Sequence, residues 1–395
     1  MSGAPRAQES GRERRGFGLY VHWPFCVSKC PYCDFNSHVA DAIDEDAWRD
    51  ALLTEISHYA NETTGRTLDT VFFGGGTPSL MPPAIVEAIL TEAAARWTLS
   101  ADLEVTLEAN PSSVEAQKFA DFRAAGVNRV SIGVQSLDDA ALRFLGRAHE
   151  AREAVDAITI AKRTFERFSF DLIYALPGQD ADAWRAALRD ALALAGDHLS
   201  LYQLTIEKGT PFYAEHRRGA FTLPDDDVSA GLYEITGNIM ESSGLPAYEV
   251  SNYARPGSEC RHNLIYWQGG DYVGVGPGAH GRLRRDGARI ATEQIPAPHA
   301  WLAAVIEKGH GTRNSDIVSN TEQIEEYLMT GLRLLRGIDR AGFEAATGVP
   351  LAGAAAPDRL ARLVEEGLME SDAARIRVTT AGLTRLNAII AYLLD

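Results

Sequence analysis

The chain has 395 residues, 45% of them hydrophobic, and a formal net charge of −16 at pH 7. This length allows a large buried core and two or three domains. The negative charge argues against a nucleic-acid partner, because binding through phosphates requires a basic surface. No apolar run approaches the roughly 20 residues of a membrane-spanning helix. We therefore expect a protein that is not integral to a membrane and binds no nucleic acid.

The first 16 residues, MSGAPRAQESGRERRG, are polar and charged. They contain no apolar segment of the kind found in secretory signals. The segment contains arginines, but Gln8, Glu9 and Glu13 break it and it has no amphipathic apolar side, so a transit peptide is the less favoured alternative. We favour a disordered leader over residues 1–16 and a cytoplasmic protein.

Six apolar segments alternate with amphipathic helical patterns from residue 17 onward. The segments are rich in β-branched or aromatic residues and bounded by turn residues, as strands are; they are residues 18–23, 70–76, 103–110, 129–136, 168–178 and 199–206. Successive β-then-α units predict a parallel sheet with right-handed crossovers. We expect an α/β fold over residues 17–243, as a partial barrel or an open doubly wound sheet. The working site of such folds lies at the carboxyl ends of the strands.

The pattern changes after residue 243. Residues 244–311 are rich in Gly, Tyr and Asn, and residues 244–281 among them predict mainly loop. Residues 312–395 predict a mainly helical domain that ends as helix, short strand pair and helix, the outline of a winged-helix-like module. Since the chain is acidic, we interpret this module as a packing domain rather than a DNA reader.

Three of the four cysteines, Cys26, Cys30 and Cys33, follow the first expected strand with the spacing C-x3-C-x2-C. A structural zinc would require a fourth ligand. The residues that could supply it are His22, His38, Cys260 and His262. Iron–sulfur clusters are commonly held by four cysteines, so a cubane held by three would leave one iron open to a small molecule. The spacing alone leaves both metals open.

The stretches GLYVHWPFCVSKCPYCDFNSH and FFGGGTPSL together resemble the radical S-adenosylmethionine superfamily. The resemblance implies that the three cysteines hold a 4Fe–4S cluster, whose open iron is chelated by the amino and carboxylate groups of S-adenosylmethionine. An electron from the reduced cluster would then cleave the sulfonium to a 5′-deoxyadenosyl radical. In such systems the cofactor performs the chemistry and the protein positions it.

Longer motifs narrow the resemblance to the oxygen-independent coproporphyrinogen III oxidase group and, within it, to the haem chaperone branch, the HemW family. They are LYVHWPFC, CPYCDFNSH, GGGTPS, LEANP, SIGVQS, FDLIYALPGQ, LSLYQLTIEKGTPF, YEVSNYA and CRHNLIYWQGGDYVGVGPGAHG. They extend over nearly everything after residue 17. The resemblance implies a partial (β/α)6 radical-SAM barrel followed by a HemN-like C-terminal domain.

The resemblance also assigns site residues, with the three cysteines as cluster ligands. The residues that would contact S-adenosylmethionine or its neighbour are Tyr20, Tyr32, Gly74, Gly75, Gly76, Thr77, Glu108, Gln135, Arg147 and Asp171. Glycines permit positive φ and close approach of the backbone to a ligand. Independently, a Glu, a Gln and an Asp at strand ends suit a ribose, an amino group and a sulfonium. The alternative for each is a helix cap or a rim salt bridge.

Phe35 separates the two branches of the group. The oxidases proper have a further cysteine two residues after the third, where this chain has Phe35, and a longer N-terminal extension near their substrate. Both departures argue against decarboxylation of coproporphyrinogen. They favour the chaperone branch, which is thought to bind haem and hand it to acceptors such as membrane respiratory enzymes.

The segment RHNLIYW offers a haem ligand. His262 begins the H-N-x-x-Y-W motif associated with haem in this branch, and Tyr266 and Trp267 could pack against a porphyrin face. Cys260 could supply a thiolate ligand instead. The alternative without haem is that His262 is a hydrogen-bonded residue of the core. We therefore expect haem and unidentified haem-accepting proteins as partners, and leave a homodimer open.

Two other functions stay open at this point. The first is a radical enzyme that acts on a tetrapyrrole, such as oxygen-independent coproporphyrinogen III oxidase, and cleaves S-adenosylmethionine productively. The second is a zinc-stabilised binding protein.

Overall fold

The computed structural model describes residues 15–40, 42–354 and 356–394, so residues 1–14 of the expected leader lie outside it. The described chain forms two compact units. The larger unit comprises residues 17–264 and 271–318, and the smaller comprises residues 15–16, 265–270 and 319–394. None of the helices described is long and apolar enough to span a bilayer.

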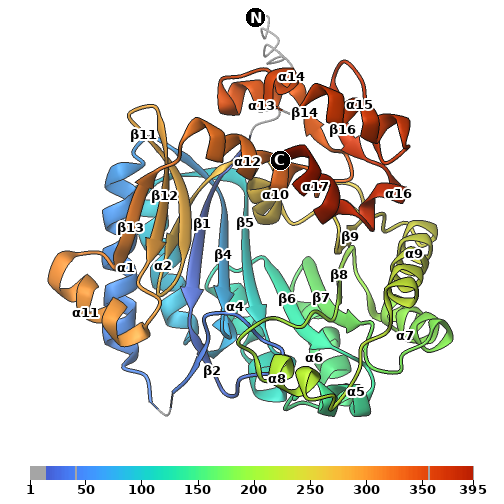
Figure 1. The fold of residues 1–395 in the computed structure, drawn as a ribbon. Coiled ribbons are helices and arrows are strands. Elements are labelled where there is room, and N and C mark those ends of the chain that lie inside the picture. The colour runs from blue at the N-terminus through green and yellow to red at the C-terminus, as the bar shows by residue number, and fades with distance from the viewer. Residues whose placement is uncertain (1–14, 41, 355, 395) are drawn as a thin grey trace, which may run out of the picture. The chain divides into compact units, whose positions relative to one another are not determined.

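The larger unit is built on one sheet, which has 11 strands within the described residues (Figure 1). Its central parallel strands are β1 (Phe17–Trp23), β4 (Thr67–Gly75), β5 (Thr98–Ala109), β6 (Arg129–Gln135), β7 (Arg167–Tyr174) and β8 (His198–Gln203). They lie side by side in chain order, and each of them contains most of one predicted strand. Strands β9 (Asn252–Ala254) and β13 (Thr312–Ile317) are the two edges of the described sheet, which is open rather than closed. The predicted α/β partial barrel is confirmed.

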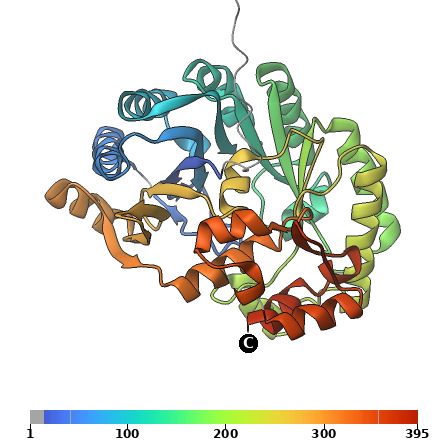
Figure 2. The same ribbon diagram turned by 90° about the horizontal axis from the view of Figure 1, so that it is seen from above.

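Helices alternate with these strands, and most of them lie on the outer side of the curved sheet (Figure 2). They are α1 (Glu45–Glu62), α2 (Pro83–Arg96), α3 (Ser113–Gln117), α4 (Phe119–Ala124), α5 (Asp139–Phe144), α6 (Ala151–Thr164), α7 (Ala181–Leu194), α8 (Pro211–Arg217) and α9 (Asp226–Ser242). Short strands β2 (Phe25–Cys26) and β3 (His38–Val39) pair in parallel around the cysteine loop. A 3-10 turn (Pro78–Leu80) follows β4.

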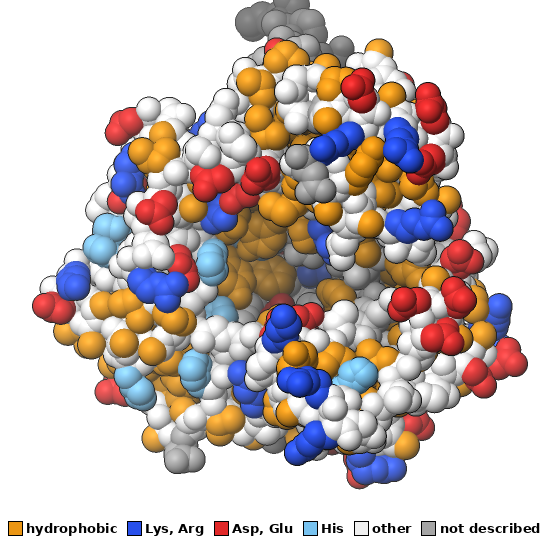
Figure 3. Space-filling model, viewed as in Figure 1, with side chains coloured by type: hydrophobic (Ala, Val, Ile, Leu, Met, Phe, Trp, Pro, Cys, Tyr) orange, Lys and Arg blue, Asp and Glu red, His pale blue; other side chains and the backbone are white. Residues whose placement is uncertain are grey.

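The parallel strands have one apolar and one polar face. The apolar face packs against the helices in the main core and includes Val21, Phe73, Leu107, Ile132 and Phe170. The alternate positions of the same strands are mostly polar and include Tyr20, Thr106, Glu108, Ser131, Ser169 and Asp171. Parallel strands that are covered on both faces are usually apolar throughout. The polar face instead lines an interior, and the surface on this side is hollowed (Figure 3).

The segment 244–281, predicted to be mainly loop, contains regular elements. It forms β9, α10 (Arg261–Trp267), β10 (Asp271–Val275) and the start of β11 (His280–Arg285). Strand β10 pairs in parallel with β1, and β11, β12 (Ala288–Gln294) and β13 continue the sheet antiparallel. A Cβ at Gly274 would clash with the His280 carbonyl, and one at Gly276 with the His22 carbonyl. The glycines that suggested a loop are required by this close packing of backbones.

The smaller unit is mainly helical, as predicted. After α11 (Pro298–Lys308) and β13 of the larger unit, its elements are α12 (Asn320–Gly331), β14 (Ile338–Asp339), α13 (Arg340–Thr347), α14 (Leu351–Ala354), α15 (Pro357–Glu365), β15 (Met369–Ser371), β16 (Arg375–Val378), α16 (Thr380–Leu383) and α17 (Leu386–Leu394). The three strands form a sheet in the order β14-β16-β15. Helix α15, the β15–β16 pair and α17 reproduce the predicted helix, strand pair and helix.

A buried carboxylate fastens the added strands to α1. The fully buried Glu55 accepts hydrogen bonds from the backbone N–H of Gly276 (2.8 Å), the backbone N–H of Gly311 (2.6 Å) and Trp301 Nε1 (3.0 Å). Burial raises its pKa to about 7. These donors follow β10, precede β13 and lie in α11, so one side chain of α1 joins three segments.

We predict that Glu55→Gln lowers the free energy of unfolding by about 1–3 kcal/mol. The amide group of Gln would point its own N–H toward the N–H donors that Glu55 accepts from, so at least one buried donor would lose its acceptor. Urea unfolding followed by circular dichroism measures the change. Glu62→Gln, on the same helix, removes a surface ion pair with Arg285 and should cost less than about 1 kcal/mol. Equal losses in the two variants would contradict the role of Glu55.

Candidate functional site: the cysteine loop and the strand ends

The cysteine loop begins where β1 ends. Cys26 lies in β2, and the backbone N–H of Cys33 donates to the Cys30 carbonyl at 3.1 Å in the turn that follows. Pairing of β2 with β3 closes the loop, so three sulfurs are held on one short segment. All three thiols are free and partly exposed, whereas Cys260 is buried.

Each sulfur of the loop has a polar neighbour. Thr77 Oγ1 donates to Cys26 Sγ at 3.4 Å, and Arg147 Nη1 donates to Cys30 Sγ at 3.4 Å. Cys33 Sγ lies 3.9 Å from Ser37 Oγ. Hydrogen bonds and positive charge stabilise thiolates, which are the form that ligates metal. Burial raises the pKa of the Cys26 thiol, and the Thr77 hydroxyl opposes this rise.

Among the residues that the structure describes, no three His, Cys, Asp or Glu side chains are close enough to hold one metal ion. In a cubane cluster each cysteine binds a different iron, so the thiolates need not meet at one point.

The glycine run at the end of β4 lies directly against the segment that leads into the cysteine loop. The backbone N–H of Gly76 donates to the Trp23 carbonyl (2.7 Å), and that of Thr77 to the Phe25 carbonyl (2.8 Å). A Cβ at Gly76 would lie 2.8 Å from the Phe25 carbonyl oxygen, and Gly75 has a φ of 113°. The run is therefore needed for packing, and it brings Thr77 to the first cysteine.

Two carboxylates face the interior near this point. Burial and the nearby charge of Asp171 raise the pKa of Glu108 to about 8, while a hydrogen bond from the Gly75 backbone opposes the rise. Burial raises the pKa of Asp171 to about 6, against the hydrogen bond from Ser200. Burial and Glu108 also raise the pKa of Tyr20. A cationic ligand would favour both charged carboxylates.

Gln135 and Arg147 have buried polar atoms with no hydrogen-bond partner among the described residues: Gln135 Oε1 and Arg147 Nε. Gln135 also has a φ of 68°, which non-glycine residues rarely adopt. Unsatisfied buried groups are costly, and strained residues gather at functional sites. An acceptor and a donor at this strand end fit a ligand with amino and carboxylate groups, as S-adenosylmethionine has.

The structure thus brings the predicted cluster and cofactor residues to one end of the sheet. Tyr32 joins them from the cysteine loop, with its ring 6.3 Å from that of Phe212 in a separate small core. Sequence reasoning missed Asn110, whose side chain connects Thr77 to Arg147. The signal was available, because Asn110 lies in the strand-end motif LEANP.

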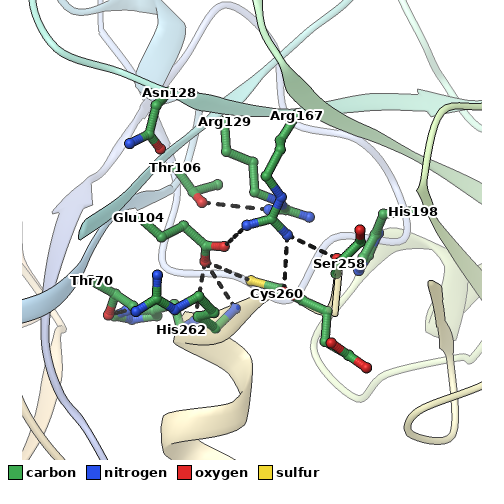
Figure 4. Close-up of polar contacts among 12 residues, drawn as sticks. Thr70, Glu104, Thr106, Asn128, Arg129, Arg167, His198, Ser258, Cys260 and His262 are labelled. Atoms are coloured by element: carbon green, nitrogen blue, oxygen red, sulfur yellow. Dashed lines mark hydrogen bonds and ion pairs between the residues drawn. The ribbon is translucent and has the colours of Figure 1, made fainter. Parts of the chain in front are cut away.

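His262 lies in the first turn of α10, beside Thr70 and Glu104 (Figure 4). It is 1% exposed, its Nδ1 is 2.7 Å from Thr70 Oγ1, and its ring stacks on Phe72 with centroids 5.1 Å apart. Burial lowers its pKa to about 3. Thr70 and its neighbour in the register, Glu104, precede Gly74 and Glu108 by four residues on their strands.

Glu104 holds the beginning of the motif helix. Its Oε1 accepts from the backbone N–H groups of Arg261 (2.9 Å) and His262 (3.3 Å), and its Oε2 pairs with Arg167 at 2.5 Å. Arg167 in turn donates to the carbonyls of Ser258 (2.8 Å) and Glu259 (3.0 Å). Two side chains, Glu104 of β5 and Arg167 of β7, therefore hold the backbone before α10 and at its first two residues (Figure 4).

The three predicted haem residues are divided between the units. Tyr266 and Trp267, at the end of α10, belong to the smaller unit, where the Arg333 guanidinium lies 5.0 Å from the Trp267 ring centroid. Phe35, which distinguishes the two branches of the resemblance, is 60% exposed beside the third cysteine.

Two family models match this chain. Residues 20–191 match the Radical SAM superfamily and residues 318–384 match the HemN C-terminal domain. The first match contains all of the predicted cluster and cofactor residues.

Curated relatives match over nearly the full length. The bovine (Bos taurus) Radical S-adenosyl methionine domain-containing protein 1, mitochondrial, is 41% identical over 100% of this chain and 90% of its own. Heme chaperone HemW of Escherichia coli (strain K12) is 38% identical over 95% of this chain and 97% of its own. Heme chaperone HemW of Bacillus subtilis (strain 168) is 35% identical over 92% and 95%.

A solved structure shares the fold. Coproporphyrinogen III oxidase (HemN) from Escherichia coli, a radical SAM enzyme, superposes with a TM-score of 0.80 and 24% identity, over 96% of this chain and 90% of that one.

The pKa of Glu108 makes stability depend on pH. Its folded value of about 8 exceeds the ordinary 4.5, so the folded state binds a proton that the unfolded state releases between these values. The free energy of unfolding therefore falls as pH rises through this window. We predict that the free energy of unfolding of Glu108→Gln, whose amide stays neutral, rises relative to that of the wild type from pH 6 to pH 9. Urea unfolding at each pH measures the difference.

Glu92→Gln is the control for this series. The hydrogen bond from Ser57 holds the pKa of Glu92 below its ordinary value, so this group does not titrate between pH 6 and pH 9. Its difference from the wild type should stay constant across the series. A constant difference for Glu108→Gln as well would contradict the raised pKa.

Proposed function

Because the chain belongs to the radical S-adenosylmethionine superfamily, in the group that includes the haem chaperones HemW, we propose that it binds haem and delivers it to acceptor haem proteins. The observation that carries this proposal is the match over nearly the whole chain to relatives named heme chaperone HemW. Phe35 supports it, because the oxidase branch of the resemblance has a cysteine there.

In this proposal Cys26, Cys30 and Cys33 hold a 4Fe–4S cluster and S-adenosylmethionine binds the open iron. When bound, the cluster supplies the electron that cleaves the sulfonium. The donors at Cys26 and Cys30 stabilise thiolate charge. For S-adenosylmethionine, Asp171 and Glu108 suit the cationic sulfonium and amino group. Gln135 Oε1 can accept from an N–H or hydroxyl, and Arg147 can donate to a carboxylate.

His262 is the proposed haem ligand. Burial lowers the pKa of its imidazole to about 3 and so keeps the ring neutral, which is the form of histidine that ligates a metal. Since the imidazole is 1% exposed, haem reaches it only after the start of α10 moves. Tyr266 and Trp267 would then contact the porphyrin face.

The acceptors and the location belong to the same proposal. Respiratory haem enzymes of the membrane are the proposed acceptors. The cytoplasm is the proposed location, and the bovine, mouse and zebrafish relatives, named as mitochondrial, set the alternative.

We predict that Cys26→Ala, Cys30→Ala and Cys33→Ala each lose most of the iron and acid-labile sulfide that the wild type retains after anaerobic reconstitution. Each change removes a ligand of the proposed cluster. The matched variant Cys260→Ala removes the fourth cysteine, which is buried away from the loop, and should retain about four irons per chain. Loss of iron in Cys260→Ala alone would place the cluster elsewhere.

Haem binding tests the chaperone function itself. We predict that the wild type, with its cluster reconstituted anaerobically, binds haem saturably in a titration followed in the Soret region. His262→Ala should weaken binding at least about tenfold, or about 1.4 kcal/mol. His198→Ala is the matched control, since His198 is also 1% exposed and bonded to a hydroxyl, that of Tyr248 at 3.0 Å; its affinity should equal that of the wild type.

Two results would contradict this reading. Equal affinities of the wild type and His262→Ala would remove His262 as the ligand. No haem binding by the wild type, together with 5′-deoxyadenosine formed in the presence of a tetrapyrrole substrate, would establish the radical enzyme instead.

A further inference from the structure

Three side chains from separate loops form one hydrogen-bonded chain between two of the cysteines. Thr77 follows β4, Asn110 follows β5 and Arg147 follows α5. Asn110 Nδ2 donates to Thr77 Oγ1 at 3.2 Å, and Arg147 Nη2 donates to Asn110 Oδ1 at 2.7 Å. The ends of the chain donate to Cys26 Sγ and Cys30 Sγ, each at 3.4 Å.

The direction of every hydrogen bond in this chain follows from Arg147. A guanidinium has donors only, so the atom of Asn110 that faces it must be the carbonyl oxygen. The amide nitrogen then faces Thr77 and donates to the hydroxyl oxygen. Since a hydroxyl has one hydrogen, and its oxygen already accepts from Asn110, that hydrogen is directed to Cys26 Sγ. Through Asn110, Arg147 thus sets the orientation of the Thr77 hydroxyl.

The members of the chain are held from outside it. The backbone N–H of Asn110 donates to Glu115 Oε2 at 3.1 Å, and Glu115, 4% exposed, also accepts from the Ser79 hydroxyl. Arg147 Nη2 donates to the Gly133 carbonyl at 2.8 Å. Asn110 therefore occupies a fixed position between the two donors.

We propose that Asn110 is a positioning residue: by binding Thr77 and Arg147 it directs one donor to each of two cluster cysteines and raises the reduction potential of the cluster. One-electron reduction by an external reductant adds negative charge to the cluster and its thiolates. Hydrogen bonds to the sulfurs stabilise that charge and are among the factors that set iron–sulfur potentials. This inference rests on the cluster of the proposed function and is independent of haem.

The test is a redox titration of the reconstituted cluster, reduced with dithionite and followed by electron paramagnetic resonance. Omitting S-adenosylmethionine separates the effect from cofactor binding. Asn110→Ala should retain the iron and sulfide of the wild type. Its equilibrium constant for reduction should be about tenfold lower, a shift of about 59 mV to lower potential for one electron.

Asn128→Ala is the matched control. Asn128 also bridges two groups in the same sheet, accepting from the backbone N–H of Val105 (2.8 Å) and donating to the Leu103 carbonyl (2.7 Å), but it bonds to none of the chain members. A loss of packing or stability alone would appear in both variants. The potential of Asn128→Ala should equal that of the wild type.

Two changes at Thr77 decide the matter if Asn110→Ala assembles no cluster. Thr77→Ser keeps the hydroxyl and should keep the wild-type potential, whereas Thr77→Val has the same shape without the donor and should shift to lower potential. Wild-type potentials in both Asn110→Ala and Thr77→Val, or an equal shift in Asn128→Ala, would overturn the inference. A wild type without iron and sulfide would instead remove the proposed cluster, and the inference with it.

Discussion

The candidate site depends on a backbone contact that continues the pairing of β1 and β4 beyond both strands. Gly76 and Thr77 donate to the carbonyls of Trp23 and Phe25, and this joins the start of the cysteine loop to the end of β4. A side chain at Gly76 would separate the two segments. Since Thr77 reaches Cys26 only while this contact holds, the ligand loop and its hydrogen-bond donors are positioned together. Parallel pairing with β5 and β6 then brings Glu108, Asn110 and Gln135 to the same end of the sheet, where the strands have their carboxyl ends.

Several groups at this end of the sheet destabilise the folded protein when no ligand is bound. Glu108 and Asp171 are two neighbouring acids whose pKa values are both raised, and Gln135 and Arg147 each have a buried atom without a partner in the described structure. The apolar core on the other face of the sheet compensates for this loss. This end of the sheet needs little rearrangement to receive a cationic, polar cofactor, because the charges and acceptors are already in place.

The sequence predicted the features that depend on local order. The strand segments and their parallel order follow from alternation and turn residues, and the three cysteines were evident from their spacing. Their assignment to a cluster required the resemblance, because spacing alone also allowed zinc. Contacts between distant residues could not be derived: Thr70 and His262 are 192 positions apart, and Asn110 and Arg147 are 37 apart. The strands within residues 244–281 were missed because glycine was interpreted as a loop former, whereas here it allows two backbones to approach.

In the proposed function, the burial of His262 bears on how haem would be released. In the structure described here, the imidazole contacts Thr70 and Phe72, and Glu104 caps the beginning of its helix. Haem would have to displace these contacts in order to bind, and their recovery would favour its departure. Contacts that stabilise the His262 side chain without haem lower the affinity for haem, because the free energy of these contacts is lost when haem binds. Because a carrier must bind its cargo less tightly than the acceptor does, an occupied resting place for His262 suits delivery better than an exposed ligand would.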